Sequence, residues 1–227
     1  MPSALTHIAG PADFAAAFAV PRETVEKLEL YAELLKKWQR AVNLVAPSTL
    51  GDVWHRHFAD SAQLVQLAQR APDANIWVDL GSGGGFPGLV IAILLANHEN
   101  QFVHLIESNG RKCAFLAEVV RRTGVAAEIH EARIEDLARG GRIGQADVVT
   151  SRALAPLKLL LQLASGFCSD RTLGLFLKGR DARQEIAEAQ PLYQFEFDCV
   201  PSRTGGGGMI VEVRKLGSNG GVSKSAR

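Results

Sequence analysis

The sequence predicts an α/β fold, in which a mostly parallel seven-stranded sheet ends in an antiparallel closing hairpin and follows an N-terminal helical extension. Three observations support this prediction. The first seventy or so residues show only helical spacing, short apolar runs then alternate with helical stretches, and two final apolar runs flank a glycine-rich loop. Strands that alternate with helices are typical of parallel βαβ units. We therefore expect a helical extension over residues 1–74 and a sheet domain over residues 75–216.

The extension is expected to contain two long helices. Residues 22–42 place apolar side chains three or four positions apart, with Glu and Lys on the opposite face, which predicts an amphipathic helix. The segment NLVAPST at residues 43–49 interrupts this pattern, and helical spacing resumes over residues 51–69. The polar residues 70–74 then separate the extension from the sheet.

The sheet is expected to contain five parallel strands before the hairpin. We assign these strands to residues 76–80, 102–106, 127–130, 147–151 and 173–178. The intervening helices are expected at residues 87–97, 111–123, 134–139, 156–166 and 182–190. With a hairpin of residues 194–200 and 209–215, this order resembles the class I methyltransferase variant of the Rossmann-like fold rather than the dehydrogenase variant. The Gly- and Ser-rich tail at residues 217–227 is expected to be disordered.

Composition limits the possible classes of function. With 47% hydrophobic residues, a chain of 227 residues can bury one substantial core, and 25 basic against 24 acidic residues create no strong overall field. Any binding of RNA must therefore depend on local clusters. The three cysteines are far apart and never paired as C-x-x-C, so we expect neither disulfides nor a metal site. Without a recognisable signal peptide or membrane span, we expect a cytoplasmic protein with no membrane partner.

The strongest local signal is the segment VDLGSGGGFPG at residues 78–88, between the first strand and its helix. Glycines such as Gly81 and Gly83 allow positive φ and a close approach of the backbone to a ligand. A structural turn or an NAD site could use the same pattern. At the end of the second strand, however, the carboxylate of Glu107 can accept both ribose hydroxyls of a nucleoside. An adenosine-bearing cofactor is therefore implied.

Two residues distinguish S-adenosyl-L-methionine from NAD. Asp79 suits a cationic sulfonium and ammonium but would repel a pyrophosphate, and Pro87 removes one amide donor from the helix start. The alternative is that Asp79 only caps its own loop. After the third strand, Ile134 could pack on adenine while Glu135 or a backbone N–H addresses its edge. A helix start with acidic residues explains the same segment equally well.

The end of the fourth strand carries SRALAP at residues 151–156, which lacks the Asn- or Asp-Pro-Pro-aromatic motif typical of enzymes that methylate exocyclic amines. No cysteine is placed at a strand end for covalent catalysis at a pyrimidine C5. The strand ends instead offer Arg152, Lys178 and Arg180. Arg152 could anchor either the methionine carboxylate or the substrate.

Five segments together resemble one family: HRHFADS (55–61), DLGSGGGFPG (79–88), ESNGRKCAFL (107–116), SRA (151–153) and Lys178-Gly179. The chain is similar to the RsmG (GidB) family from about residue 38 to residue 215. The resemblance implies S-adenosylmethionine-dependent methylation of N7 of one guanine in bacterial 16S rRNA. It also implies cofactor contacts by Gly81, Phe86, Ile134, Glu135 and Arg152. The sequence departs from the family pattern at Val45, usually Thr, and at Gly205–Gly208, where a basic residue is common.

Guanine N7 is an unprotonated lone pair, so this chemistry needs alignment and no general base. We expect Lys178 and Arg152 to be the catalytic residues, with Lys178 holding the guanine O6. The expected phosphate contacts are Arg56, His57, Arg111, Lys112 and Arg180, although His57 could equally be a core histidine. The expected partner is 16S rRNA or an assembling small ribosomal subunit, bound by a monomer. The alternatives are a methyltransferase acting on a protein or small molecule, and a non-catalytic RNA- or ribosome-binding protein.

Overall fold

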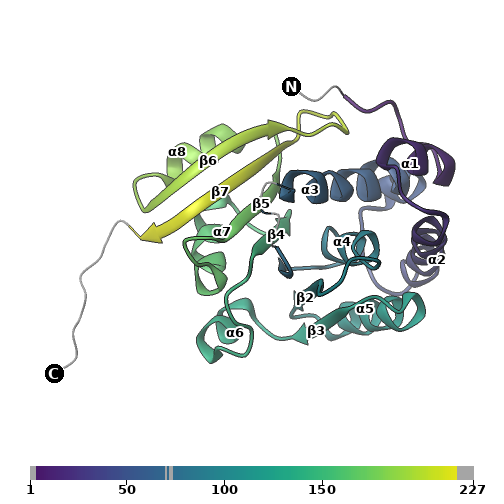
Figure 1. The fold of residues 1–227 in the computed structure, drawn as a ribbon, viewed down its shortest axis with the longest axis horizontal. Coiled ribbons are helices and arrows are strands. Elements are labelled where there is room, and N and C mark those ends of the chain that lie inside the picture. The colour runs from purple at the N-terminus through teal and green to yellow at the C-terminus, as the bar shows by residue number, and fades with distance from the viewer. Residues whose placement is uncertain (1–3, 70, 72–73, 219–227) are drawn as a thin grey trace.

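The computed structural model, which describes residues 4–69, 71 and 74–218, contains one seven-stranded sheet in the order β3-β2-β1-β4-β5-β7-β6 (Figure 1). The first five strands are parallel, and β7 is antiparallel to both of its neighbours. The strands are β1 (Ile76–Leu80), β2 (Phe102–Glu107), β3 (Ala127–Glu131), β4 (Val148–Arg152), β5 (Leu173–Lys178), β6 (Tyr193–Pro201) and β7 (Met209–Ser218). This arrangement confirms the predicted fold class, the methyltransferase variant with a closing hairpin.

Helices cover both faces of the sheet because neighbouring strand residues point to opposite sides. Trp77 of β1 belongs to the core under α1 (Pro11–Phe18), α2 (Arg22–Trp38), α3 (Asp60–Ala68), α4 (Gly88–Leu94) and α5 (Gly110–Thr123). Val78 belongs to the core under α6 (Ile134–Gly140), α7 (Leu157–Ala164) and α8 (Ala182–Ala189). Across residues 4–69, 71 and 74–218, every helix is too short or too polar to cross a membrane.

The N-terminal helices share a single core with the sheet. The ring of Tyr31 in α2 stacks on Phe86 of the loop after β1, with centroids 5.2 Å apart, and also contacts Phe58 and Phe115. All four side chains are buried. Because aromatic pairs bury large areas, these contacts fix the extension against the loop at the edge of the sheet.

The segment expected as one helix over residues 51–69 is divided into three. A short 3₁₀ helix (η1, Pro47–Asp52) leads into a wide π turn (η2, Trp54–Ala59), and α3 follows. The hydroxyl of Ser61 donates to the carbonyl of His57 at 2.7 Å, a side-chain bond that competes with regular helical pairing. The structure also differs from the prediction elsewhere: α1 was not assigned from the sequence, α2 ends at Trp38 rather than at residue 42, and β7 extends to Ser218, into the expected tail. Residues 219–227 of that tail lie outside the described residues.

Candidate active site

An open cavity of about 1240 Å³ lies at the carboxyl ends of β1, β2, β4 and β5. Its walls also include the start of α6, the N-terminal extension and the loop between β6 and β7. This edge of a parallel sheet is the usual ligand site in doubly wound folds. Because single-ligand pockets measure roughly 300–1,000 Å³, this cavity has room for two reactants.

The loop after β1 presents its backbone to this cavity. Gly81 and Gly83 have φ angles of 69° and 56°, in the region that favours glycine. A Cβ added at Gly83 would meet only the carbonyl oxygen of Gly81, at 3.7 Å, whereas one added at Gly81 would clash with Leu154 at 2.6 Å. The backbone at Gly83 is therefore open to an approaching ligand.

Glu107 is fixed at the end of β2 by two backbone donors. The N–H of Gly83 donates to its Oε2 at 3.0 Å, and the N–H of Asn109 donates to its Oε1 at 2.8 Å. The carboxylate also lines the cavity. Since each carboxylate oxygen has more than one lone pair, Glu107 can accept further hydrogen bonds from a ligand.

Asp79 lies behind the glycine loop and does not line the cavity. Its Oδ2 accepts from the N–H of Gly88 at 3.2 Å, and its Oδ1 accepts from the hydroxyl of Thr150 at 2.9 Å. Burial raises the pKa of Asp79 to about 6, although hydrogen bonds and Arg152 act in the opposite direction. The expected direct contact with a cationic cofactor does not fit this position; the alternative, in which Asp79 caps its own loop, does.

Ile134 and Glu135 line the cavity at the start of α6, together with Ala132. Arg133 has an extended backbone, with φ −71° and ψ 143°, so that α6 begins at Ile134. The first N–H groups of a helix have no partner within the helix and are available to a ligand. An apolar side chain and polar backbone groups therefore lie next to each other at this wall.

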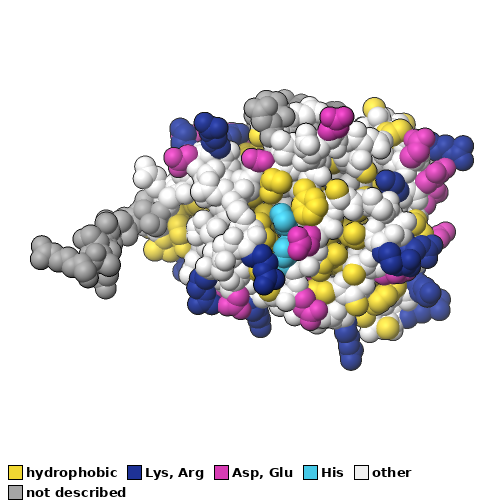
Figure 2. All heavy atoms as spheres, turned by 60° about the horizontal axis from the view of Figure 1, so that its bottom comes forward, with side chains coloured by type: hydrophobic (Ala, Val, Ile, Leu, Met, Phe, Trp, Pro, Cys, Tyr) yellow, Lys and Arg dark blue, Asp and Glu magenta, His cyan; other side chains and the backbone are white. Residues whose placement is uncertain are grey.

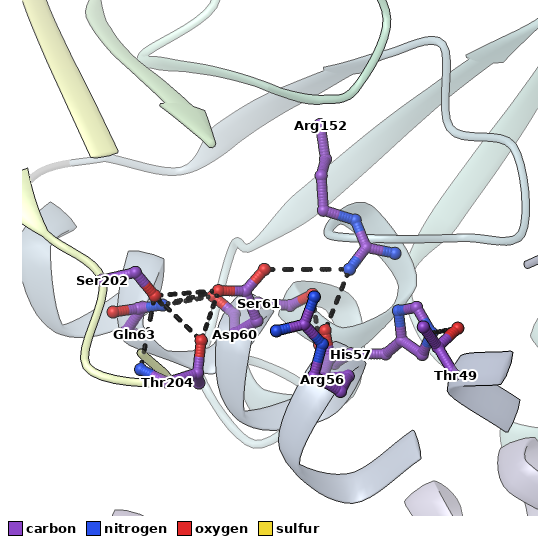
Figure 3. A network of polar contacts seen from close by, with 9 residues as sticks. All are labelled: Thr49, Arg56, His57, Asp60, Ser61, Gln63, Arg152, Ser202 and Thr204. Atoms are coloured by element: carbon purple, nitrogen blue, oxygen red, sulfur yellow. Dashed lines mark hydrogen bonds and ion pairs between the residues drawn. The ribbon is translucent and has the colours of Figure 1, made fainter. Parts of the chain in front are cut away.

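Arg152, the last residue of β4, reaches from the sheet toward the N-terminal extension (Figure 3). Its guanidinium lies over the ring of Phe86, 4.8 Å from the centroid, donates to the carbonyl of Arg56 at 3.3 Å, and lies 3.8 Å from Oδ2 of Asp60. Burial lowers the pKa of Arg152, which Asp60 partly offsets. A guanidinium still keeps its charge at neutral pH, so Arg152 is a half-buried cation in the cavity wall.

Residues 24–203 match the profile of a protein family described as GidB, rRNA small subunit methyltransferase G. The chain belongs to the GidB family. A Parvibaculum lavamentivorans protein named ribosomal RNA small subunit methyltransferase G is 46% identical over 203 residues, covering 89% of this chain and 88% of that protein. The protein of the same name from Methylorubrum populi is 48% identical over 197 residues, covering 87% and 91%. The family resemblance is thus confirmed, and the chain is a methyltransferase.

Solved structures support the fold of this GidB family member. A candidate O-methyltransferase from Klebsiella pneumoniae aligns with a TM-score of 0.59 over 90% of this chain and 96% of that one, at 15% identity. The fibrillarin pre-rRNA processing protein of Methanococcus jannaschii aligns with a TM-score of 0.50 over 63% and 66%, at 12% identity. At such low identity the likeness concerns the fold alone.

His57 is a neutral ring in the wall of the GidB cavity. It stacks on Phe86 with centroids 4.8 Å apart, and its Nε2 lies 2.8 Å from the hydroxyl of Thr49. Burial lowers the pKa of His57 to about 3, with Arg152 and Arg56 contributing in the same direction. A neutral imidazole does not supply the positive charge expected for phosphate contact, and the alternative of a core histidine fits better.

Lys178 lines the cavity but is largely engaged by other groups. Its Nζ lies 2.6 Å from Oε2 of Glu185 and donates to the carbonyl of Ala155 at 2.8 Å, and its side chain is 8% exposed. Glu185, in α8, also accepts from the N–H of Leu157 at 2.6 Å. Only the third ammonium hydrogen remains for a substrate, so the expected contact with guanine O6 would have to compete with an ion pair.

The other expected RNA contacts fall into two groups. Arg56, Lys112 and Arg180 line the cavity, and Nε of Arg180 donates to the carbonyl of Gly206 at 3.3 Å. Arg111 is exposed on the first turn of α5 and does not line it. Three of the predicted basic residues thus surround the same opening.

Asp60 is a site residue that was not predicted from the sequence. Its Oδ1 accepts from the hydroxyls of Ser202 and Thr204 and from Nε2 of Gln63, each at 3.0 Å, while its Oδ2 faces Arg152 (Figure 3). Asp60 thereby joins α3 to the loop between β6 and β7. Its position in the segment HRHFADS was a signal, but partners 142 and 144 residues away could not be read from local spacing.

Proposed function

We propose that this chain transfers the methyl group of S-adenosylmethionine to N7 of a guanine in small-subunit (16S) rRNA, either free or in an assembling subunit. The observation that carries the proposal is one cavity that combines an open glycine loop, the fixed carboxylate of Glu107, the half-buried Arg152 and a basic rim. The name of the relatives, ribosomal RNA small subunit methyltransferase G, supports rRNA as the acceptor.

S-adenosylmethionine, when bound, would supply a methyl group on a positively charged sulfur. The free lone pairs of Glu107 suit ribose hydroxyls, and Ile134 with the N–H of Glu135 suits adenine. The backbone at Gly81 and Gly83 suits close approach of the ligand. Arg152 suits a carboxylate such as that of the methionine part. Asp79 would act indirectly, by holding the N–H of Gly88 and thus the loop.

Guanine N7 is the favoured acceptor because the chain lacks the residues that methylation of a pyrimidine carbon or of an exocyclic amine needs. Burial raises the pKa of Cys113 to about 11 and that of Cys168 to about 12, so neither supplies a thiolate at neutral pH for attack on a pyrimidine carbon. The segment Ser151–Pro156 has no Pro-Pro-aromatic sequence to accept the hydrogens of an exocyclic amine. N7 needs no deprotonation, so a site without a general base is sufficient.

The protein would contribute alignment and exclusion of water. Arg152, held by Phe86 and Asp60, fixes one reactant against the sheet edge, and a correctly oriented pair of reactants gains much of the rate enhancement from proximity. Arg56, Lys112 and Arg180 at the rim would bind phosphates, which gives affinity that falls as the salt concentration rises.

Chemical mapping tests the acceptor atom. An N7-methylated guanine carries a fixed positive charge, and borohydride followed by aniline cleaves the RNA there. After incubation of 16S rRNA and small subunits with the protein and labelled S-adenosylmethionine, we expect primer extension to stop at one guanine. Labelled rRNA without a cleavage site would overturn N7 and retain RNA as the substrate. Cofactor binding without labelling in any assembly state would favour a protein or small-molecule acceptor.

A further inference from the structure

Three side chains that commonly bind metals lie together on β2 and β3, outside the cavity. His104 is on β2, while Glu128 and His130 are on β3. The strand register pairs His104 with Glu128, and His130 follows two residues later, so all three point to the same face of the sheet. In Figure 2 the molecule is turned so that the side with β3 and α6 in Figure 1 comes toward the viewer. Histidine side chains are visible on this side beside acidic and basic groups.

The distances between the three side chains are suitable for binding one metal ion. Nδ1 of His104 lies 2.9 Å from Nε2 of His130, and Oε2 of Glu128 lies 3.9 Å from both nitrogens. Two imidazole nitrogens this close cannot both direct bare lone pairs at each other, so a proton or a cation must lie between them. Two imidazoles and a carboxylate are a donor set typical of zinc and related ions.

Only small movements would complete the coordination. With Zn–N bonds of about 2.0–2.1 Å and tetrahedral angles, the two nitrogens would lie about 3.3 Å apart. The side chains of His130 and His104 are 3% and 16% exposed and therefore held in place, whereas Glu128 is 55% exposed and free to approach. The two histidines are therefore already close to the positions that an ion needs, and Glu128 can move to complete its coordination.

We propose that His104, Glu128 and His130 bind a divalent transition metal ion, with Zn²⁺ as the reference ion, leaving at least one position for water. When the ion enters, the ring that carries the shared proton shifts to its other tautomer, so both rings stay neutral and no proton is lost. Because β3 is the outermost strand, the ion would fasten it to β2. Arg142 repels positive charge at His130 and so opposes binding.

Calorimetry with ZnCl₂ at pH 7.5, on full-length protein treated with EDTA and dialysed, tests the site. We expect one ion per chain, binding at least about tenfold weaker in Glu128→Gln and no binding in His104→Gln, because each loses a ligand. Arg142→Ser, at an exposed position, is expected to bind severalfold more tightly. The matched control is His98→Gln, an exposed histidine outside the cluster, which is expected to bind like the wild type.

A second readout keeps the proposal falsifiable if a histidine variant does not fold. Zn²⁺ is expected to raise the Tm of the wild type clearly more than that of Glu128→Gln, whose substitution lies at an exposed residue. Co²⁺ is expected to give visible absorption bands in the wild type and in His98→Gln, and none in His104→Gln. No heat of binding, unchanged affinity in Glu128→Gln, or equal loss in His98→Gln would each overturn the site.

Discussion

At the scale of single residues, the cavity depends on a few charges whose environments differ sharply. Arg152 is a half-buried cation whose side chain is 19% exposed, with an aromatic ring on one side and Asp60 nearby, whereas Arg121 is an exposed cation paired with Glu118 on a helix surface. A charge taken out of water contributes much more to a ligand than a solvated one. We therefore expect Arg152 to contribute more to activity than Arg121 does.

Substitution of Arg152 tests this difference. We expect Arg152→Ala to lower kcat/KM for methyl transfer at least tenfold, about 1.4 kcal/mol or more of transition-state stabilisation. Arg121→Ala serves as the matched control and is expected to leave turnover unchanged. Equal losses in the two variants, measured with labelled cofactor and rRNA, would refute the ranking.

Asp60 acts through Arg152 and the loop between β6 and β7, so we expect it to be a positioning residue. In Asp60→Asn the amide oxygen can still accept from Ser202 and Thr204, but the NH₂ group then faces Arg152 and repels it. We expect kcat/KM to fall at least about threefold, with little change in Tm. Asp52→Asn, at an aspartate paired with His7, is the control for loss of one carboxylate. A fall in Tm that accounts for all lost activity would show a purely structural role.

His57 gives a prediction about pH. Its folded pKa of about 3 lies below the unfolded value of about 6.5, so the unfolded chain binds more protons between these values. Its contribution to stability is complete above pH 6.5 and is lost as the pH falls toward 3. The free energy of unfolding of His57→Phe should therefore change less steeply with pH than that of the wild type, by up to about 1.4 kcal/mol per pH unit. Parallel curves from denaturant titrations would exclude a neutral His57.

At the scale of elements, the glycine loop and the strand ends form the side of the cavity that we propose for the cofactor. The loop is joined to β2 through the N–H of Gly83 and to the N-terminal extension through the rings of Tyr31 and Phe86. A change in loop backbone is therefore expected to alter ligand binding before it alters the sheet.

Gly83→Val tests the loop. Its added Cβ meets no heavy atom closer than 3.7 Å, so the fold should persist, but a β-branched residue is strained at φ 56° and projects toward the cavity. We expect calorimetry to show at least a tenfold loss of S-adenosylmethionine affinity, about 1.4 kcal/mol or more. Gly144→Val, with open space and no positive φ, is the control. Unchanged affinity in Gly83→Val would remove the loop from the binding site.

The elements themselves were largely predictable from local pattern. Residues 76–80 and 173–178 were assigned as strands with the observed bounds, because a short apolar run between polar segments is typical of a buried strand. Glu107 and the glycine loop followed from their place at strand ends. The π turn at residues 54–59 was not predictable, because its residues continue the helical spacing and the bond from the hydroxyl of Ser61 to the carbonyl of His57 leaves no mark in that spacing.

Partners that lie in other secondary-structure elements explain the rest of what was missed. The ion pair between Lys178 and Glu185 and the bond between Asp79 and Thr150 both determine whether a charge is free, and no periodicity reveals them. The contact of Asp60 with the last hairpin spans more than half the chain. Residue type and strand position were enough to predict where the cavity lies. Which of its side chains are free to contact a ligand could be seen only in the folded structure.

At the scale of the whole molecule, methyl transfer and the proposed metal site are separate, because His104, Glu128 and His130 do not line the cavity. Phenanthroline removes transition metals but leaves the Mg²⁺ that folds rRNA. We expect turnover in its presence to stay within about twofold of the untreated rate, since N7 chemistry needs no Lewis acid. Complete loss of turnover, restored by Zn²⁺, would contradict a metal-independent mechanism.

The bonds from Ser202 and Thr204 to Asp60 also have a consequence for biosynthesis. A ribosome that adds about 5–20 residues per second needs roughly 7–30 s to reach Ser202 after it has made Asp60. During that interval the strands up to β5 can pair, but Asp60 lacks the two hydroxyl donors that hold it beside Arg152. We therefore expect chains stalled before residue 200 to bind the cofactor poorly, so that activity begins only when translation is nearly complete.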